Sequence, residues 1–127
     1  MRLRIFLPHK ELLDVETQKI KAESSMGHFT LKPRHIDMTS TLVPGILSYT
    51  TDTGKTEYLA VDHGLLVKQG YMVKVVSRRA FLGELGQLEA EVRKMTDIAD
   101  ERERSARSAV ARLEADFVRR FLEVGTS

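Results

Sequence analysis

The first two thirds of the chain alternate apolar and polar residues with the period of β-strands. From Arg2 to Leu7 the odd positions are Leu, Ile and Leu, so one face of a strand can be buried. Ile36 and Met38 continue this spacing after Pro33. All three prolines and six of the eight glycines fall before residue 84, between short segments rich in Val, Ile, Leu, Thr and Tyr. Turns at this spacing predict antiparallel strands that close into two packed sheets or a barrel.

One turn in this region has an alternative interpretation. Asp52-Thr53-Gly54-Lys55 separates two apolar segments, 45–49 and 56–61, and Asp followed by Gly is typical of a β-hairpin. Gly54-Lys55-Thr56 also resembles the end of a phosphate-binding loop. That motif needs a glycine where Tyr49 stands and a helix after it. A strand-like segment follows instead, so the hairpin is favoured.

After Gly83 the pattern changes to the period of an α-helix. Five apolar residues spaced three and four apart share one helix face, and a second stripe follows them: Leu85, Leu88, Val92, Met95 and Ala99, then Ala106, Val110, Leu113, Phe117 and Phe121. Two helices meeting near the polar stretch 97–105 can form a hairpin. The absence of glycine and proline from 87 to 124 allows one continuous helix instead.

The sequence therefore predicts an α+β fold. We expect an antiparallel β-sandwich head at residues 1–83 and an α-helical tail at residues 84–127. The tail is expected to be a two-helix hairpin or an extended helix, and the residues alone leave both forms open.

Composition and charge exclude several classes of protein. Of the 127 residues, 42% are hydrophobic and 30% are charged, which is ordinary for a folded domain and too apolar for a disordered chain. A net charge of +2 gives no strong attraction to nucleic acid or to an anionic membrane. The apolar N-terminal run that Pro8 ends is too short for a signal peptide, and nothing approaches a membrane span. The absence of cysteine excludes disulfides and suits the cytoplasm.

The reactive side chains form no pattern typical of a catalytic, metal or cofactor site. The four histidines, at positions 9, 28, 35 and 63, lie in or beside predicted turns and share no ligand spacing. No serine lies in a Gly-x-Ser-x-Gly elbow, and carboxylate pairs occur only in the tail, on different sides of a helix. We expect no catalytic residue, no metal and no cofactor.

Arginine is dense in the last part of the chain, at Arg102, Arg104, Arg107, Arg112, Arg119 and Arg120. One interpretation is an ordinary charged helix with ion pairs one turn apart, such as Arg112 with Asp116. The other is a basic helix that docks on an acidic protein surface. Nucleic-acid binding is disfavoured because no stacking aromatic residues are interleaved with the basic ones.

Several short motifs occur in the order that one family shows. They are Gly27-His28-Phe29-Thr30-Leu31, Pro33-Arg34-His35, Leu42-Val43-Pro44-Gly45 and Gly64-Leu65-Leu66-Val67, with a Val-rich strand at 73–76. With its helical tail, the chain resembles the epsilon subunit of F-type ATP synthases over its whole length. The stretches 101–107 and 111–114 resemble the version from an alternate, sodium-type operon. The stretch 82–89 lacks the family's Ile-Asp-x-x-Arg-Ala pattern, so we expect no ATP binding.

The resemblance implies a non-catalytic rotor subunit on the cytoplasmic face of the plasma membrane, bound to the membrane only through its complex. Its implied partners are the gamma subunit, the c-ring, and the alpha and beta subunits. The residues expected to contact the c-ring are Glu23, Ser24, Ser25, Met26, Lys32, Arg34 and His35. Those expected to contact the catalytic subunits and inhibit ATP hydrolysis, once the tail extends, are Arg107, Arg112, Arg119 and Arg120. Folded as a hairpin on the head, the tail would bury the seams that contain Leu88, Val92, Leu113 and Phe117.

Two other functions are alternatives. The first is a free-standing β-sandwich adaptor that dimerises through its helices, at Leu88, Val92 and Met95. The second is a small enzyme, which the lack of a reactive constellation disfavours.

Overall fold

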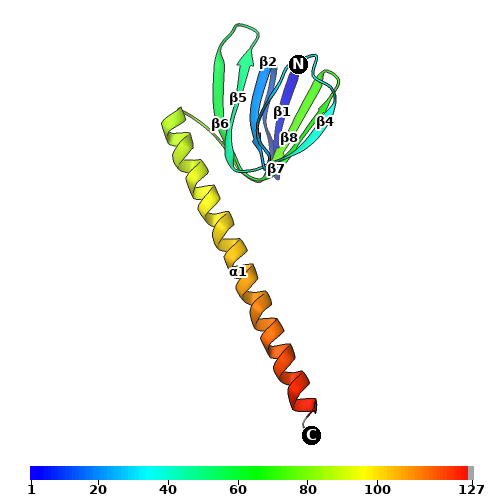
Figure 1. Cartoon of the computed structure of the whole chain (residues 1–127). Coiled ribbons are helices and arrows are strands. Elements are labelled where there is room, and N and C mark those ends of the chain that lie inside the picture. The colour runs from blue at the N-terminus through cyan, green and yellow to red at the C-terminus, as the bar shows by residue number, and fades with distance from the viewer. Residues whose placement is uncertain (126–127) are drawn as a thin grey trace. The chain divides into compact units, whose positions relative to one another are not determined.

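The computed structural model describes residues 1–125 of the chain, and the side chains of residues 1–122. Nine strands precede one helix in this part of the chain (Figure 1): β1 (Arg2–Leu7), β2 (Lys10–Ser24), β3 (Gly27–Leu31), β4 (Met38–Leu42), β5 (Gly45–Thr51), β6 (Thr56–Val61), β7 (Gly64–Gln69), β8 (Met72–Ser77), β9 (Ala80–Leu82) and α1 (Leu85–Gly125). The chain divides into two compact units, Met1–Met95 and Thr96–Ser127.

The strands form two layers that share β2. The first layer has the order β4-β7-β8-β1-β2, and the second has the order β3-β2-β5-β6-β9. Neighbouring strands are antiparallel except β1 and β8, which are parallel. The first half of β2 pairs with β1 up to Glu16, and the second half pairs with β5 from Thr17 onward. A register shift between Thr17 and Lys19 lets the strand pass from one layer to the other.

The main core lies between the two layers and follows the alternation of the sequence. Leu3 and Ile5 of β1 are fully buried, whereas their neighbours Arg2 and Arg4 lie on the outer face. The opposite layer contributes Ile20, Leu31, Leu47 and Leu59, which are also fully buried. Each aliphatic side chain buried in this way contributes about 1.5–3 kcal/mol to the free energy of unfolding. These residues hold the sandwich closed.

The start of α1 packs on a second, smaller core. Ala60 of β6 alternates with Leu59, so it faces away from the main core, and it pairs across the sheet with Ile46. Leu88 and Met95 of α1 are buried against Ala60, with Val92 partly buried beside them. The middle of the first apolar seam is therefore buried, at Leu88 and Met95, whereas Leu85 at its start is 44% exposed.

A buried aspartate joins the two places where the chain passes between layers, β6 to β7 and β8 to β9. Asp62 is 4% exposed, and its Oδ1 accepts a hydrogen bond from the backbone N–H of His63 at 2.7 Å. Its Oδ2 lies 3.4 Å from Nε of Arg79. The backbone N–H of Asp62 donates to Oγ of Ser77 at 3.1 Å. These contacts fix the entry to β9, and therefore the start of α1.

The tail is one helix, and the two-helix hairpin is wrong. α1 continues from Leu85 to Gly125 through the polar stretch 97–105. No glycine or proline lies between Gly86 and Gly125, so nothing interrupts the ladder of hydrogen bonds from each N–H to the carbonyl four residues earlier. The expected α+β architecture with a β-sandwich head is confirmed, and of the two forms of the tail the structure has the continuous helix.

Two local predictions have opposite outcomes. The hairpin at 52–55 is confirmed, because β5 and β6 are antiparallel and the backbone N–H of Thr51 donates to the carbonyl of Lys55 at 2.8 Å. The strand expected to include Ile36 begins only at Met38, and Ile36 is 78% exposed in the preceding loop. The spacing of two apolar residues was too short a pattern to fix a strand.

Candidate partner-binding surfaces

The first group of predicted contact residues forms the turn between β2 and β3. Oγ of Ser24 accepts a hydrogen bond from the backbone N–H of Met26 at 3.1 Å and donates one to the carbonyl of Gly27 at 3.1 Å. Gly27 has φ of 119°, a conformation that favours glycine. One hydroxyl therefore closes the turn, and Met26 at its tip is 96% exposed. Glu23 lies further back, over Gly45.

The second group lies in the loop between β3 and β4, residues 32–37. Lys32, Arg34 and His35 are all exposed. The backbone N–H of His35 donates to the carbonyl of Lys32 at 2.9 Å, which closes a tight turn around Pro33. The two carbonyls of His35 and Gly70 both accept hydrogen bonds from the side chain of Lys68, at 2.6 and 3.0 Å. The loop is therefore tied to the turn between β7 and β8.

The structure does not bring the two groups together. They stand at opposite ends of β3, whose five residues span about 16 Å. The turn at Ser24–Gly27 lies beside the start of β5, since the backbone N–H of Val43 donates to the carbonyl of Glu23 at 3.3 Å. The loop 32–37 lies beside Gly70 instead. A partner that contacts both groups must extend along the length of β3.

The outer face of the first layer carries an apolar row that the sequence analysis did not single out. Leu65 pairs with Val76 across β7 and β8, and Phe6 pairs with Val76 across β1 and β8. Leu65 and Val76 are 40% and 51% exposed. Strand alternation could have revealed this row, because Leu3, Ile5, Val73 and Val75 point inward and leave Phe6 and Val76 on the opposite face.

Ion pairs occupy the rest of that outer face, along β1 and β2. Nε of Arg2 lies 2.6 Å from Oδ1 of Asp14, and Nε of Arg4 lies 2.7 Å from Oε1 of Glu11. Hydrogen bonds from these guanidinium groups hold the pKa of Asp14 and of Glu11 below their ordinary values. The pKa of Glu16 is also lowered, mainly because the hydroxyl of Tyr71 donates to its carboxylate. Since Arg2 and Arg4 are paired with these carboxylates, they offer little free positive charge to a partner.

The third candidate surface is the part of α1 that belongs to the second unit. Nη2 of Arg107 lies 2.9 Å from Oε1 of Glu103, and Nη2 of Arg119 lies 3.4 Å from Oδ1 of Asp116. Asp116 is thus paired with Arg119, and the pair with Arg112 considered in the sequence is not formed. Within residues 1–122, Arg112 and Arg120 have no ion-pair partner.

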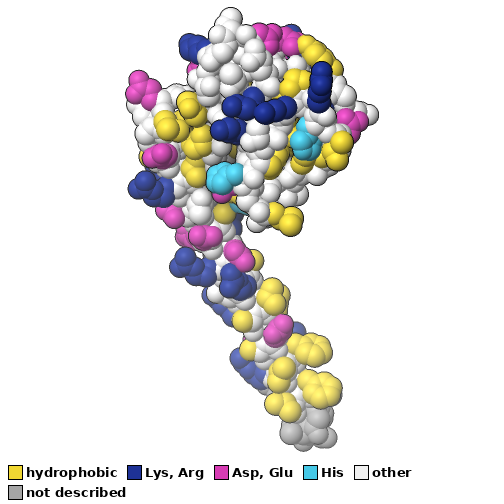
Figure 2. All heavy atoms as spheres, turned by 45° about the horizontal axis from the view of Figure 1, so that its top comes forward, with side chains coloured by type: hydrophobic (Ala, Val, Ile, Leu, Met, Phe, Trp, Pro, Cys, Tyr) yellow, Lys and Arg dark blue, Asp and Glu magenta, His cyan; other side chains and the backbone are white. Residues whose placement is uncertain are grey.

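An apolar stripe runs along the same helix. Val110, Leu113, Phe117 and Phe121 are each more than half exposed. Figure 2 shows hydrophobic side chains along one side of this segment and Lys and Arg side chains on the other. The expectation that Leu113 and Phe117 would be buried on the head is therefore wrong, because it depended on the hairpin. An exposed stripe of this kind is typical of a helix that binds a partner. No helix among residues 1–125 is long and apolar enough to cross a membrane.

Comparisons with known proteins agree on one family. The family described as ATP synthase, Delta/Epsilon chain, beta-sandwich domain matches residues 1–83. The chain is 33% identical over 122 residues to ATP synthase epsilon chain 2 of Cereibacter sphaeroides, which covers 94% of this chain and 84% of that protein. It is 30% identical over 125 residues to ATP synthase epsilon chain 2 of Paraburkholderia xenovorans, covering 96% and 90% of the two chains.

Solved structures share the fold. A chain of the Euglena gracilis mitochondrial ATP synthase matches with a TM-score of 0.58 and 19% identity over 63% of this chain. The match spans 51% of that Euglena chain, about half its length. A chain of the central stalk and c-ring structure of the Tetrahymena thermophila mitochondrial ATP synthase matches with a TM-score of 0.55 and 17% identity, covering 76% and 90% of the two chains.

Proposed function

Since this chain belongs to the delta/epsilon chain family of ATP synthase, we propose that its β-sandwich couples the gamma subunit to the c-ring in the central stalk. The chain is a non-catalytic epsilon subunit of F-type ATP synthase. Its functional division follows the sequence, with a coupling head at 1–83 and a regulatory tail at 84–127. Both relatives are named epsilon chain 2, which supports the alternate copy of the subunit.

The head suits a part that transmits force between partners. Its two layers share one continuous strand, β2, and a fully buried aliphatic core lies between them. Such a close-packed interior has low compressibility and transmits strain instead of absorbing it. The single observation that carries the proposal is this sandwich, matched over residues 1–83 by the family. The subunit would lie on the cytoplasmic face and reach the membrane through its complex.

The contacts with the c-ring are proposed for both ends of β3. At one end stand Glu23, Ser24, Ser25 and Met26, and at the other stand Lys32, Arg34 and His35. Met26 supports the first group because it is an exposed apolar tip on a turn closed by hydrogen bonds. The exposed cationic side chains of the loop support the second group.

The tail is proposed to inhibit ATP hydrolysis. Arg107, Arg112, Arg119 and Arg120 would contact acidic segments of the alpha and beta subunits, and the apolar stripe would lie along a neighbouring helix of the stalk. The continuous α1 supports this role, with its exposed stripe and with Arg112, which has no ion-pair partner within residues 1–122. Truncation after Ser105 is expected to raise the ATPase activity of the assembled enzyme. Unchanged activity would remove the inhibitory role and leave the head's role standing.

The coupling role is tested by binding. The tagged chain, co-expressed with the gamma subunit of the same organism, should elute with gamma as one complex in size-exclusion chromatography. The free-standing adaptor predicts a stable homodimer and no affinity for gamma. The names of the relatives do not favour the adaptor.

A further inference from the structure

Lys68 is a buried lysine at the edge of the main core. It stands two residues after Leu66 in β7, so both side chains leave the strand on the same face, toward the interior. Leu66 is fully buried and Lys68 is 2% exposed. An ammonium group removed from water in this way is strongly destabilising unless hydrogen bonds replace the lost hydration. The groups that the ammonium of Lys68 binds must therefore explain why the residue is buried.

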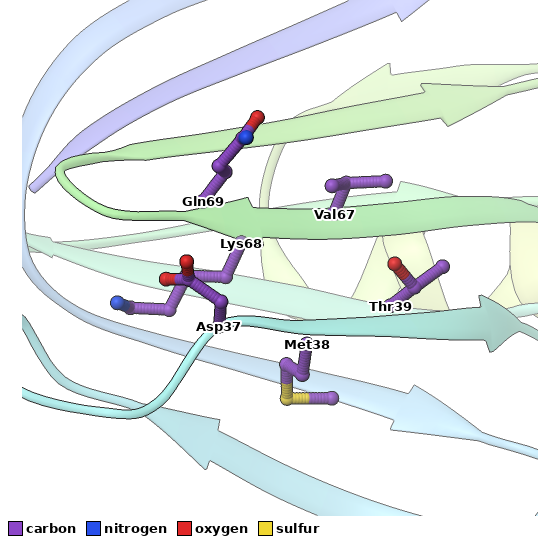
Figure 3. A pocket seen from close by; sticks show the side chains of 6 residues that line it. All are labelled: Asp37, Met38, Thr39, Val67, Lys68 and Gln69. Atoms are coloured by element: carbon purple, nitrogen blue, oxygen red, sulfur yellow. The ribbon is translucent and has the colours of Figure 1, made fainter.

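The partners of Lys68 are backbone carbonyls of two neighbouring segments. Nζ donates to the carbonyl of His35 at 2.6 Å and to the carbonyl of Gly70 at 3.0 Å. No carboxylate of the described residues forms an ion pair with it. A third bond runs beside these two, from the backbone N–H of Gly70 to Oδ1 of Asp37 at 2.7 Å. Lys68 and Asp37 line the same shallow hollow (Figure 3).

These three bonds join the loop 32–37 to the turn between β7 and β8. The carbonyl of His35 and the carboxylate of Asp37 belong to the loop, whereas the carbonyl and the N–H of Gly70 belong to the turn. Asp37 is the only carboxylate between residues 32 and 37, and its Oδ1 accepts a bond from the protein's own backbone. The remaining charged side chains of the loop, Lys32 and Arg34, are exposed. The loop therefore shows mainly positive charge to a partner.

We propose that Lys68, Asp37 and Gly70 form a clamp that holds the loop 32–37 as a preformed cationic surface for an acidic segment of a partner protein. The partner's chemistry follows from the charge of the loop, since opposite charges favour association and set its orientation. The clamp matters because a loop ordered before binding does not lose that conformational entropy on association. Lys68 is a positioning residue, because it acts through the loop and does not face the partner. The inference rests on the proposed function in one respect only, which is that the loop docks on a partner within the ATP synthase.

The clamp itself is tested on the isolated full-length chain with Lys68→Met, which keeps most of the side-chain volume and removes the ammonium. Trypsin can cut after Arg34, whereas the Lys32–Pro33 bond resists it because proline follows. The rate of cleavage at Arg34, followed by mass spectrometry, is expected to rise on the order of 10-fold. Losing one hydrogen bond to a charged group makes local opening of the loop about that much more frequent. Amide exchange at Gly70 and His35 should accelerate with it. Lys74→Met, the same change at an exposed position of β8, is the matched control and should leave both rates unchanged.

Two further variants keep the test sharp if Lys68→Met does not fold. Asp37→Ala removes the acceptor of the Gly70 N–H and should accelerate the same cleavage, whereas Asp37→Asn keeps an oxygen acceptor and should restore the wild-type rate. Unchanged cleavage in both Lys68→Met and Asp37→Ala would overturn the clamp.

Docking is tested with the ATP synthase of the same host, depleted of its own epsilon subunit. Arg34→Gln should weaken rebinding of the chain and reduce the salt dependence of that rebinding, because one exposed charge is lost. Lys68→Met should weaken rebinding although the exposed side chains of Lys32 and Arg34 are both kept. Rebinding equal to wild type in both variants would overturn the docking surface. Failure of the wild-type chain to rebind would instead contradict the proposed function. The trypsin experiment would still test the clamp, because it uses the isolated chain.

Discussion

Two leucines on one helix provide a direct test of the form of the tail. Leu88 and Leu113 are 25 residues apart, close to seven helical turns, so they lie on the same face of α1. Leu88 is 1% exposed and packs against Ala60 and Met95, whereas Leu113 is 70% exposed. The same substitution at both positions therefore compares a buried site with an exposed one at constant chemistry and constant helical context.

The structure sets the size of the two effects. Leu→Ala in a buried site costs about 2–5 kcal/mol, and we expect about 2–3 kcal/mol for Leu88→Ala because its small core can partly collapse. Leu113 loses little contact on truncation, and alanine is the better helix former, so we expect a change within about 0.5 kcal/mol for Leu113→Ala.

Urea unfolding measures both effects. Tyrosine fluorescence follows the sandwich, because all three tyrosines precede residue 84, and far-ultraviolet circular dichroism follows the helix. Leu88→Ala should lower the midpoint of both signals, since a helix detached from the sheet is marginal on its own. A loss of 2 kcal/mol or more from Leu113→Ala, roughly the cost of a buried leucine, would show that the second seam is buried in solution. That result would refute the continuous exposed helix and restore the hairpin.

Three other predictions concern the first compact unit, Met1–Met95. Gly64→Ala should destabilise the fold by about 3 kcal/mol or more and lower the yield of folded protein, because its Cβ would lie 1.9 Å from a carbonyl oxygen of β8. Gly86→Ala lies in open space within α1, so it should stabilise the fold by up to about 1 kcal/mol in the same urea assay. Arg4→Met should raise the pKa of Glu11 toward its ordinary 4.5 in an NMR titration, because the guanidinium holds that pKa down. In the wild type this pairing stabilises the fold above about pH 4.5, and the stabilisation is lost as the pH falls through the lowered pKa of Glu11. Arg4→Met should therefore make the free energy of unfolding depend less on acid pH. An unchanged titration of Glu11 in the variant would contradict the pairing. Met26→Glu should leave the urea midpoint unchanged and reduce the recovery of c subunits with the chain, and full recovery would remove Met26 from the contact.

The sequence predicted the sandwich because its core follows a simple rule. Leu3 and Ile5 alternate with arginines whose partners lie on the next strand, and that local pattern survives in the structure. The parallel pairing of β1 with β8 was not predictable, since it joins strands about 70 residues apart and no local pattern specifies it. The division of β2 between two layers depends on a register shift at Thr17, which also leaves no local signal.

The form of the tail was open because its two seams fit both a hairpin and a straight helix. Only the three-dimensional structure decides between them: α1 is continuous from Leu85 to Gly125, with Leu88 buried against Ala60 and Leu113 exposed. Lys68 was missed for a different reason. A lysine in an alternating strand looks like a solvent-facing residue, and only the tertiary fold shows that it points inward.

The most direct test of the rotor function is co-purification from the host. A tagged copy of the full chain is expressed in its own organism, the membranes are solubilised gently, and the proteins that accompany it are identified by mass spectrometry. A rotor subunit should be recovered together with the gamma, alpha, beta and c subunits of an ATP synthase. Recovery of the chain alone, or as a homodimer, would contradict the rotor function and favour the adaptor.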